Sequence, residues 1–114
     1  MKMALVFVFL GVLLATVLSW GGSVKGSEYD TGKNLFEEKC QICHGANGKG
    51  DGPAAPALNP SPKDFTKPKF WQDETDKKIT DTVRKGHPPM PAFDLKDDEI
   101  RAIIDYMRHA FKKT

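Results

Sequence analysis

The chain has 114 residues, of which 39% are hydrophobic, and more than a third of these hydrophobic residues lie in the first 22 positions. The remainder is short and poor in apolar side chains, so we expect a bound group to help complete its core. The 17 Lys and Arg residues against 15 Asp and Glu give a net charge of +2, which excludes the strongly basic balance of a nucleic-acid-binding protein.

The N-terminal segment is typical of a secretory signal peptide. Lys2 precedes an uncharged apolar run over residues 4–18, and small residues follow that run where a signal peptidase would cleave. No cysteine lies near this position, which excludes a lipid anchor of the bacterial lipoprotein type. The sequence therefore predicts a signal peptide over residues 1–22.

An uncleaved membrane anchor over residues 4–20 is the alternative, because the apolar run is close to the shortest length that spans a bilayer. In both cases residues 23–114 are expected to form one exported domain. That domain is periplasmic or otherwise exported and soluble if the segment is cleaved, and membrane-anchored if it is retained.

The first predicted helix covers residues 30–40, a segment without proline. Asp30 or Thr31 can act as its N-cap, and Phe36 and Cys40 follow at helical spacing. A glycine-rich stretch after the helix ends this pattern.

A second helix is predicted over residues 75–85. Thr75 is its expected N-cap, Ile79 and Val83 lie one turn apart, and Gly86 stops the helix. The two apolar residues are expected to face the core.

The last helix is predicted over residues 97–111, with acidic residues at its start and a cap supplied by Asp97 or Asp94. All eight prolines lie between Pro53 and Pro91, so long irregular connections are expected there. The apolar stripe of the last helix consists of Ile100, Ile103, Ile104, Met107 and Phe111. These patterns predict a mainly α fold.

The segment that carries chemistry is C-x-x-C-H, formed by Cys40, Cys43 and His44. On one helical turn the two thiols and the imidazole point from the same face. Thioether bonds from both cysteines would attach a haem, and the histidine would be the proximal iron ligand. A redox-active C-x-x-C and one half of a zinc site, completed by His87 or His109, are the competing interpretations.

From about Tyr29 to Phe111 the sequence resembles class I monohaem cytochromes c. Three further motifs carry the resemblance: Gly32 and Phe36 before the haem motif with Tyr106 in the last helix; the HGANGKGDGP run that begins at His44; and the GHPPMPAF loop around Met90. The resemblance implies three to five helices wrapped around one covalent haem c (heme c). It also implies that the methionine loop supplies the second axial ligand.

Four side chains can be considered as the sixth iron ligand. Met90 is favoured, because the prolines around it stiffen the loop and exclude a helix. Met107 lies in the apolar stripe, where methionine usually fills the core. His87 and His109 are expected to face solvent, although His87 is near enough to replace Met90.

Other residues are weaker candidates for roles around the haem. Pro53 or Pro56 is expected to lend a carbonyl oxygen to His44, and Trp71 is expected either to bind a haem propionate or to pack in the core. Several lysines flank the haem segments and either dock acidic redox partners or form an ordinary solvated surface: Lys39, Lys49, Lys63, Lys67, Lys69 and Lys85.

The expected function is single-electron transfer between redox partner proteins, without catalysis, because two protein ligands leave the iron no open position. A haem subunit of a membrane-associated oxidoreductase complex is the alternative. A haem-based sensor or peroxidase-like protein is a third possibility, and it requires Met90 to be off the iron. Nucleic acid is not an expected partner, and a membrane is one only if the N-terminal segment is retained.

Overall fold

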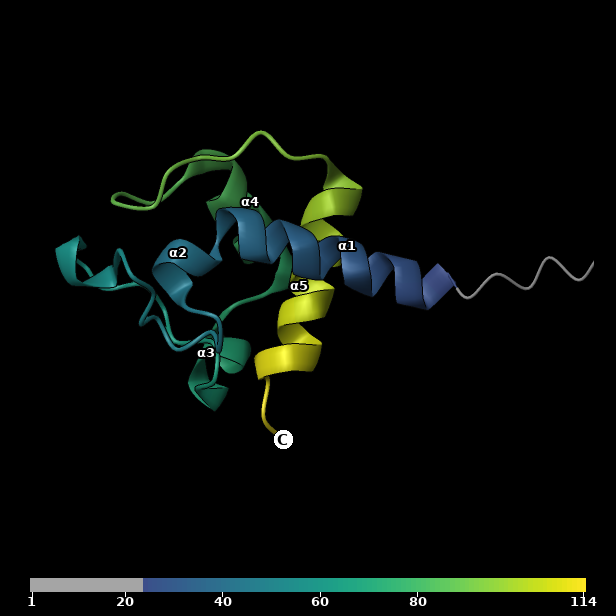
Figure 1. Cartoon of the computed structure of the whole chain (residues 1–114), viewed down its shortest axis with the longest axis horizontal. Helices are drawn as coiled ribbons and strands as arrows, with labels where there is room; N and C mark the ends of the chain where they lie inside the picture. The colour runs from purple at the N-terminus through teal and green to yellow at the C-terminus, as the bar shows by residue number, and fades with distance from the viewer. Residues whose placement is uncertain (1–23) are drawn as a thin grey trace, which may run out of the picture.

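The computed structural model describes residues 24–114, which fold into five α-helices and one short 3-10 turn (Figure 1). The helices are α1 (Val24–Lys39), α2 (Gln41–His44), α3 (Pro68–Asp73), α4 (Asp76–Lys85) and α5 (Asp97–Phe111), and the turn is Ala55–Ala57. The described range contains no β-strand, only one isolated bridge between His87 and Met90. The predicted mainly α fold of three to five helices is confirmed.

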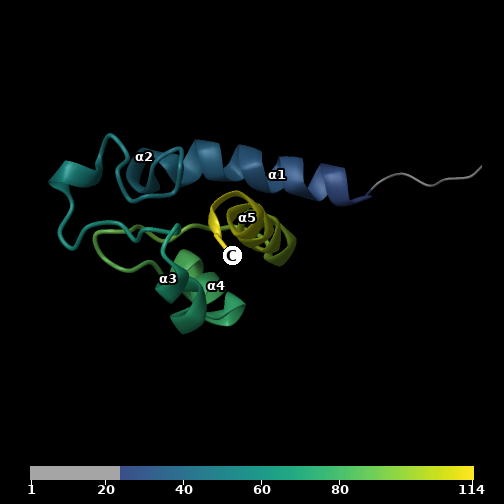
Figure 2. The same ribbon diagram turned by 90° about the horizontal axis from the view of Figure 1, so that it is seen from below.

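Helices α1 and α5 cross each other at the centre of the fold, so the two ends of the described chain pack together (Figures 1 and 2). Gly32 is buried at the crossing, where a Cβ atom would collide with the backbone of Ala102. Tyr106 on α5 meets Tyr29 on α1 edge to face, with ring centroids 5.3 Å apart. The crossing brings together Gly32, Phe36 and Tyr106, the residues of one motif that carries the sequence resemblance.

Helix α1 begins at Val24, earlier than the predicted start at Asp30 or Thr31. The prediction is wrong because Thr31 does not cap a helix. Its hydroxyl instead donates a 2.9 Å hydrogen bond to the carbonyl oxygen of Ser27, one turn earlier in the same helix. A threonine satisfied in this way allows the helix to run through it.

Helix α4 begins and ends as the sequence predicts. The side chain of Thr75 accepts a hydrogen bond from the backbone N–H of Lys78, and Gly86 ends the helix with a φ of +73°. Ile79 and Val83 are both buried. Local capping chemistry and apolar spacing therefore account for the whole element.

Helix α5 covers the predicted residues, and its apolar stripe is buried throughout. Its N-cap is Lys96, however, rather than Asp94 or Asp97. The carboxylate of Glu99 accepts a 2.8 Å hydrogen bond from the backbone N–H of Lys96. The acid therefore caps the helix by reaching back from its first turn, which is half of a capping box.

Helix α3 was not predicted from the sequence, because six residues are too few to show an apolar period. Pro68 at its first position fits a helix start, where the missing N–H is not needed. The indole N–H of Trp71 donates a 2.8 Å hydrogen bond to the carbonyl of Phe65, and the guanidinium of Arg108 lies 5.7 Å above its ring. The N–H of this indole is therefore satisfied within the protein, which favours the core-packing alternative.

The core consists of two apolar clusters. The first cluster lies around the crossing of α1 and α5 and comprises Phe36, Phe65, Ile103, Tyr106, Met107 and Phe111. The second cluster lies between α4 and α5 and comprises Ile79, Val83, Ile100 and Ile104. Phe70, Trp71 and Leu95 pack against both clusters and join them. Within residues 24–114 no helix is both long enough and apolar enough to cross a membrane.

Candidate haem site

The C-x-x-C-H segment forms a single helical turn directly after α1. Cys40 is the N-cap of α2, and the backbone N–H groups of Cys43 and His44 both donate to its carbonyl oxygen, at 3.3 and 2.9 Å. All three residues therefore lie on one turn of helical backbone, as the motif spacing predicts. This part of the predicted site is assembled by local backbone geometry alone.

The imidazole of His44 is held in place by the backbone of Lys63 and the ring of Phe65. Its Nδ1 lies 3.2 Å from the carbonyl oxygen of Lys63, 19 residues along the sequence, and its ring stacks on Phe65 with centroids 4.5 Å apart. The prediction that Pro53 or Pro56 supplies this carbonyl oxygen is wrong. Every residue in the irregular segment after the motif carries a carbonyl, so no side-chain pattern distinguishes Lys63 as the partner.

Burial lowers the pKa of His44, while the hydrogen bond to the Lys63 carbonyl acts in the opposite direction. The neutral imidazole is therefore the favoured form. Because a hydrogen bond from Nδ1–H to a carbonyl fixes the tautomer, Nε2 keeps its lone pair. A neutral ring oriented through one nitrogen is the arrangement that metal-binding histidines use.

Neither cysteine forms a disulfide, and both are half-buried. Burial raises the pKa of Cys40 to about 11, with a smaller lowering effect from the charge of Lys39 and a smaller raising effect from Cys43. The Cys40 thiol also packs against the first cluster. It is thus a neutral, apolar-facing thiol in the folded chain rather than an ionised nucleophile of the thioredoxin type.

The loop after the motif is folded tightly onto it. The backbone N–H of Gly52 donates to the carbonyl of Cys43 at 3.0 Å, and that of Ala54 donates to the carbonyl of Ile42 at 3.0 Å. A Cβ on Gly52 would lie 2.7 Å from the carbonyl carbon of Cys43, so only glycine allows this approach. The glycine-rich stretch therefore serves to wrap the chain around the motif.

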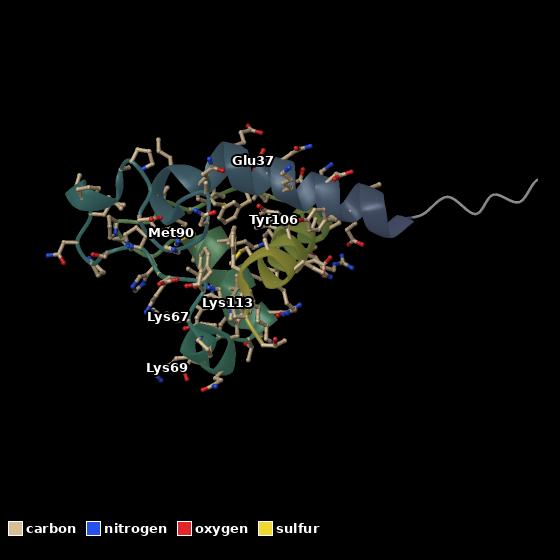
Figure 3. All side chains as sticks on the ribbon, turned by 60° about the horizontal axis from the view of Figure 1, so that its bottom comes forward. Glu37, Lys67, Lys69, Met90, Tyr106 and Lys113 are labelled. Carbon is tan, nitrogen blue, oxygen red and sulfur yellow. The ribbon has the colours of Figure 1, made fainter. Side chains whose placement is uncertain are left out.

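Met90 is carried by a loop with its own backbone restraints. His87 and Met90 exchange two backbone hydrogen bonds of 3.0 and 2.7 Å, and the N–H of Phe93 donates to the carbonyl of Val83 at 2.8 Å. The half-buried Met90 packs against the second cluster. Figure 3 shows it at the end of the molecule where α2 lies.

The other candidate ligands are placed differently. Met107 is 4% exposed and belongs to the first cluster, so it is a core residue. His87 and His109 are exposed. For the zinc alternative, no group of three or more His, Cys, Asp or Glu residues within the described range is arranged to hold a metal ion.

The donor set fits a haem. It combines two thiols and a neutral imidazole on one turn with a methionine loop at the same end of the molecule. Cys40 packs against one apolar cluster and Met90 against the other, and no polar or charged residue is buried among residues 24–114. Such surroundings suit a large apolar ring attached through sulfur and ligated by nitrogen. Fold and site together define a c-type cytochrome.

Comparison with known proteins identifies the family. The model of the family described as cytochrome c oxidase, cbb3-type, subunit III, matches residues 27–107, and the chain belongs to this family. It is a c-type cytochrome that carries covalently attached haem c and takes part in electron transfer. No match is found among curated protein sequences.

Solved structures of c-type cytochromes have the same fold. The KustC0563 c-type cytochrome is 25% identical, with a TM-score of 0.62, and the match covers 72% of this chain and 98% of that one. A chain of the Kuenenia stuttgartiensis reducing HAO-like protein complex Kustc0457/Kustc0458 is 25% identical, with a TM-score of 0.60, over 70% of this chain and 41% of that one. The cytochrome SorU from Sinorhizobium meliloti, at 23% identity and a TM-score of 0.52, shares the fold over 77% of this chain and 95% of its own.

Proposed function

We propose that the chain is an exported monohaem cytochrome c that moves single electrons between redox partner proteins. Cys40 and Cys43 hold the haem through thioether bonds, while His44 and Met90 ligate its iron. When bound, the haem supplies an iron that alternates between the ferrous and ferric states. The restraint on His44 carries the proposal, because the Lys63 carbonyl and the Phe65 ring together hold the imidazole in one orientation.

The role of Met90 is supported by its loop. The paired backbone bonds between His87 and Met90 restrict the segment, so little conformational entropy remains to be lost when the sulfur binds a metal. A neutral thioether favours the ferrous state more than a second imidazole does, which gives a comparatively high reduction potential. With both axial positions filled by the chain, the site is suited to transfer rather than to catalysis.

Replacement of Met90 by Ala tests the ligand set. The ferric wild-type protein is expected to show the weak sulfur-to-iron absorption band near the red end of its spectrum. Met90→Ala should lose this band, bind carbon monoxide when reduced and have a lower potential, because the sixth position is left open or taken by His87.

Met107→Leu is the matched control. This swap nearly conserves volume in the buried core and should cost less than about 1.5 kcal/mol of stability, with the band retained. A wild-type protein that lacks the band and binds carbon monoxide readily would contradict ligation by Met90. The sensor or peroxidase-like function would then be favoured.

Membership of the oxidase subunit family favours one alternative, a haem-carrying subunit of a membrane-associated complex. The similar chain from the Kuenenia complex points the same way, since that chain belongs to a multi-protein assembly. The two functions differ in the fate of residues 1–22, which lie outside the described part of the chain. A free carrier requires cleavage of this segment, whereas a membrane subunit retains residues 4–20 as an anchor.

The intact mass of the purified protein distinguishes these functions. For the free carrier we expect a chain that begins near residue 23, plus the mass of one haem that denaturants do not extract, recovered from the extract made without detergent. A full-length chain found only in detergent extracts of membranes would favour the anchored subunit. A chain without haem and with two free thiols, from a host able to attach haem c, would contradict both.

A further inference from the structure

A hollow lies on the surface where three segments distant in the sequence meet. Its volume is about 250 Å³, and it is lined by Asn47, Lys49, Thr66, Ala110, Phe111 and Lys113. These residues come from the loop after the haem motif, from the segment before α3 and from the C-terminal end of α5. The charged side chains that line it are both lysines. We call this feature the basic hollow.

Neither lysine of the basic hollow forms an ion pair among the described residues. Lys33, Lys69 and Lys77 each form an ion pair on their own helix, whereas no pair involves Lys49 or Lys113 within residues 24–114. The positive charge of the hollow is therefore available to a partner.

The neighbourhood of the hollow holds one further lysine, Lys67, and one carboxylate, Asp64. Lys67 and Lys49 both lie close enough to Asp64 to lower the pKa of its carboxyl group, and that carboxylate accepts hydrogen bonds from the N–H and hydroxyl of Thr66. With Lys49, Lys67 and Lys113 against Asp64, positive charge remains in excess there. Figure 3 shows Lys67 and Lys113 on one side of the molecule and Glu37 on the opposite side.

The floor of the hollow leads towards the haem motif through two aromatic rings. Phe111 lines the hollow and faces Phe65 with ring centroids 6.3 Å apart and an interplanar angle of 25°. Phe65 in turn stacks on His44 at 4.5 Å. A protein docked at the hollow would be separated from the histidine by this short stack.

We propose that the basic hollow is the docking site for an acidic side chain of a redox partner protein, so that electrons enter or leave on the His44 side of the domain. The inference rests on the proposed function and names the position and chemistry of the partner. Opposite charges across an interface raise the association rate and fix the orientation of the partners.

The competing surface is the uncharged end of the molecule, formed by α2 and the segment 52–62. There Ile42 has 58% of its surface exposed, and it is the one exposed large hydrophobic residue within the described range. A single exposed apolar side chain is common on protein surfaces and does not define an interface. The hollow is favoured because it combines unpaired charge with a route to His44.

Oxidation of the ferrous holoprotein by hexacyanoferrate(III) tests the site with a small trianion, which accepts one electron and becomes hexacyanoferrate(II). The double variant Lys49→Glu with Lys113→Glu reverses the sign of the charge that lines the hollow. Lys33→Glu with Lys77→Glu makes the same change in net charge on α1 and α4. At low ionic strength we expect the hollow variant to react roughly tenfold or more slowly than the control variant. The difference should disappear in high salt, which screens the charges.

Equal rates for the two double variants would overturn the proposal, because the net charge of the protein alone would then determine the oxidation rate. The absorption spectrum of each variant keeps this outcome separate from the haem assignment: both should show the wild-type sulfur-to-iron band. A wild-type protein without that band would contradict the proposed ligand set. Equal rates in variants that keep the band would contradict only the docking site.

A second measurement locates the contact directly. The isotope-labelled ferrous holoprotein is titrated with a hexaglutamate peptide and observed by NMR. We expect the largest amide shifts at Asn47, Lys49, Thr66 and Ala110. Shifts centred on Ile42 and residues 53–57, or no shifts at millimolar peptide, would overturn the proposed docking site.

Discussion

Asp64 organises the residues that hold His44, the proposed haem ligand. Its carboxylate accepts hydrogen bonds of 2.8 and 2.6 Å from the N–H and hydroxyl of Thr66, and it lies between Lys63, whose carbonyl holds His44, and Phe65, whose ring stacks on it. The Thr66 hydroxyl is the main cause that lowers the pKa of Asp64. One partly buried turn therefore positions two contacts to the imidazole.

This turn predicts a specific pH dependence. Because the folded pKa of Asp64 lies below its ordinary value of 3.8, the carboxylate stabilises the fold above that value and loses this contribution as the pH falls through the folded pKa. Solvent screening limits the contribution to at most about 1 kcal/mol. In thermal melts of the holoprotein, the stability advantage of wild type over Asp64→Asn should shrink on acidification.

Thr66→Val is the control for this prediction, since it removes the hydroxyl donor and leaves the carboxylate. It should show a weaker pH dependence than the wild type. A constant difference between wild type and Asp64→Asn across the same pH range would contradict the proposed role of ionised Asp64.

The crossing of α1 and α5 determines where the haem motif lies. Helix α1 leads directly into Cys40, so the angle at which it passes α5 sets the position of both cysteines and of His44. Gly32 allows the two backbones to approach closely, and Phe36 on the next turn fills the space between them with a fully buried ring. The position of the site thus depends on the packing of two helices that are distant in sequence.

Two glycines in α1 give a matched pair of substitutions. A Cβ at Gly32 would meet the Ala102 backbone, which cannot move aside, whereas a Cβ at Gly26 would meet no atom within 4 Å. Gly32→Ala is therefore expected to destabilise the holoprotein by about 1–3 kcal/mol through overpacking. Gly26→Ala should stabilise it by roughly 0.5–1 kcal/mol, as alanine does in an exposed helix.

Denaturant unfolding of both alanine variants, followed by circular dichroism, measures these changes. The two substitutions add the same methyl group to the same helix, so only the neighbouring atoms differ. Equal stabilities for the two variants would contradict the close approach of α1 and α5 at Gly32.

The sequence predicts those elements whose signals are local. Helix α4 is recognised because Thr75, the apolar spacing and Gly86 all lie within one short window, and the turn of Cys40 and His44 follows from the motif spacing alone. The start of α1 was missed because threonine can bond either as a cap or back to the previous turn. The link from His44 to Lys63 depends on a backbone carbonyl, which any residue of the segment could supply.

At the scale of the whole molecule, the two apolar clusters are the main feature. The cysteine side of the site belongs to the first cluster and the Met90 side to the second, with Phe70, Trp71 and Leu95 as shared neighbours. A domain of this size buries little apolar surface, so each cluster alone gives limited stability. A haem in contact with both clusters would stabilise the native state, because a group that binds only the folded chain shifts the equilibrium towards it.

The contact between α1 and α5 also sets an order of events during synthesis. Helix α1 is synthesised before α5, the helix with which it makes its most extensive contact. The cluster against which Cys40 packs is complete only when α5 has supplied Ile103, Tyr106, Met107 and Phe111. Since burial raises the pKa of this thiol, sulfur chemistry that needs a thiolate is easier on the unfinished chain than on the closed domain. Because the motif follows the first helix and the packing partner of that helix lies about sixty residues later, the Cys40 thiol is not fully packed until α1 and α5 meet.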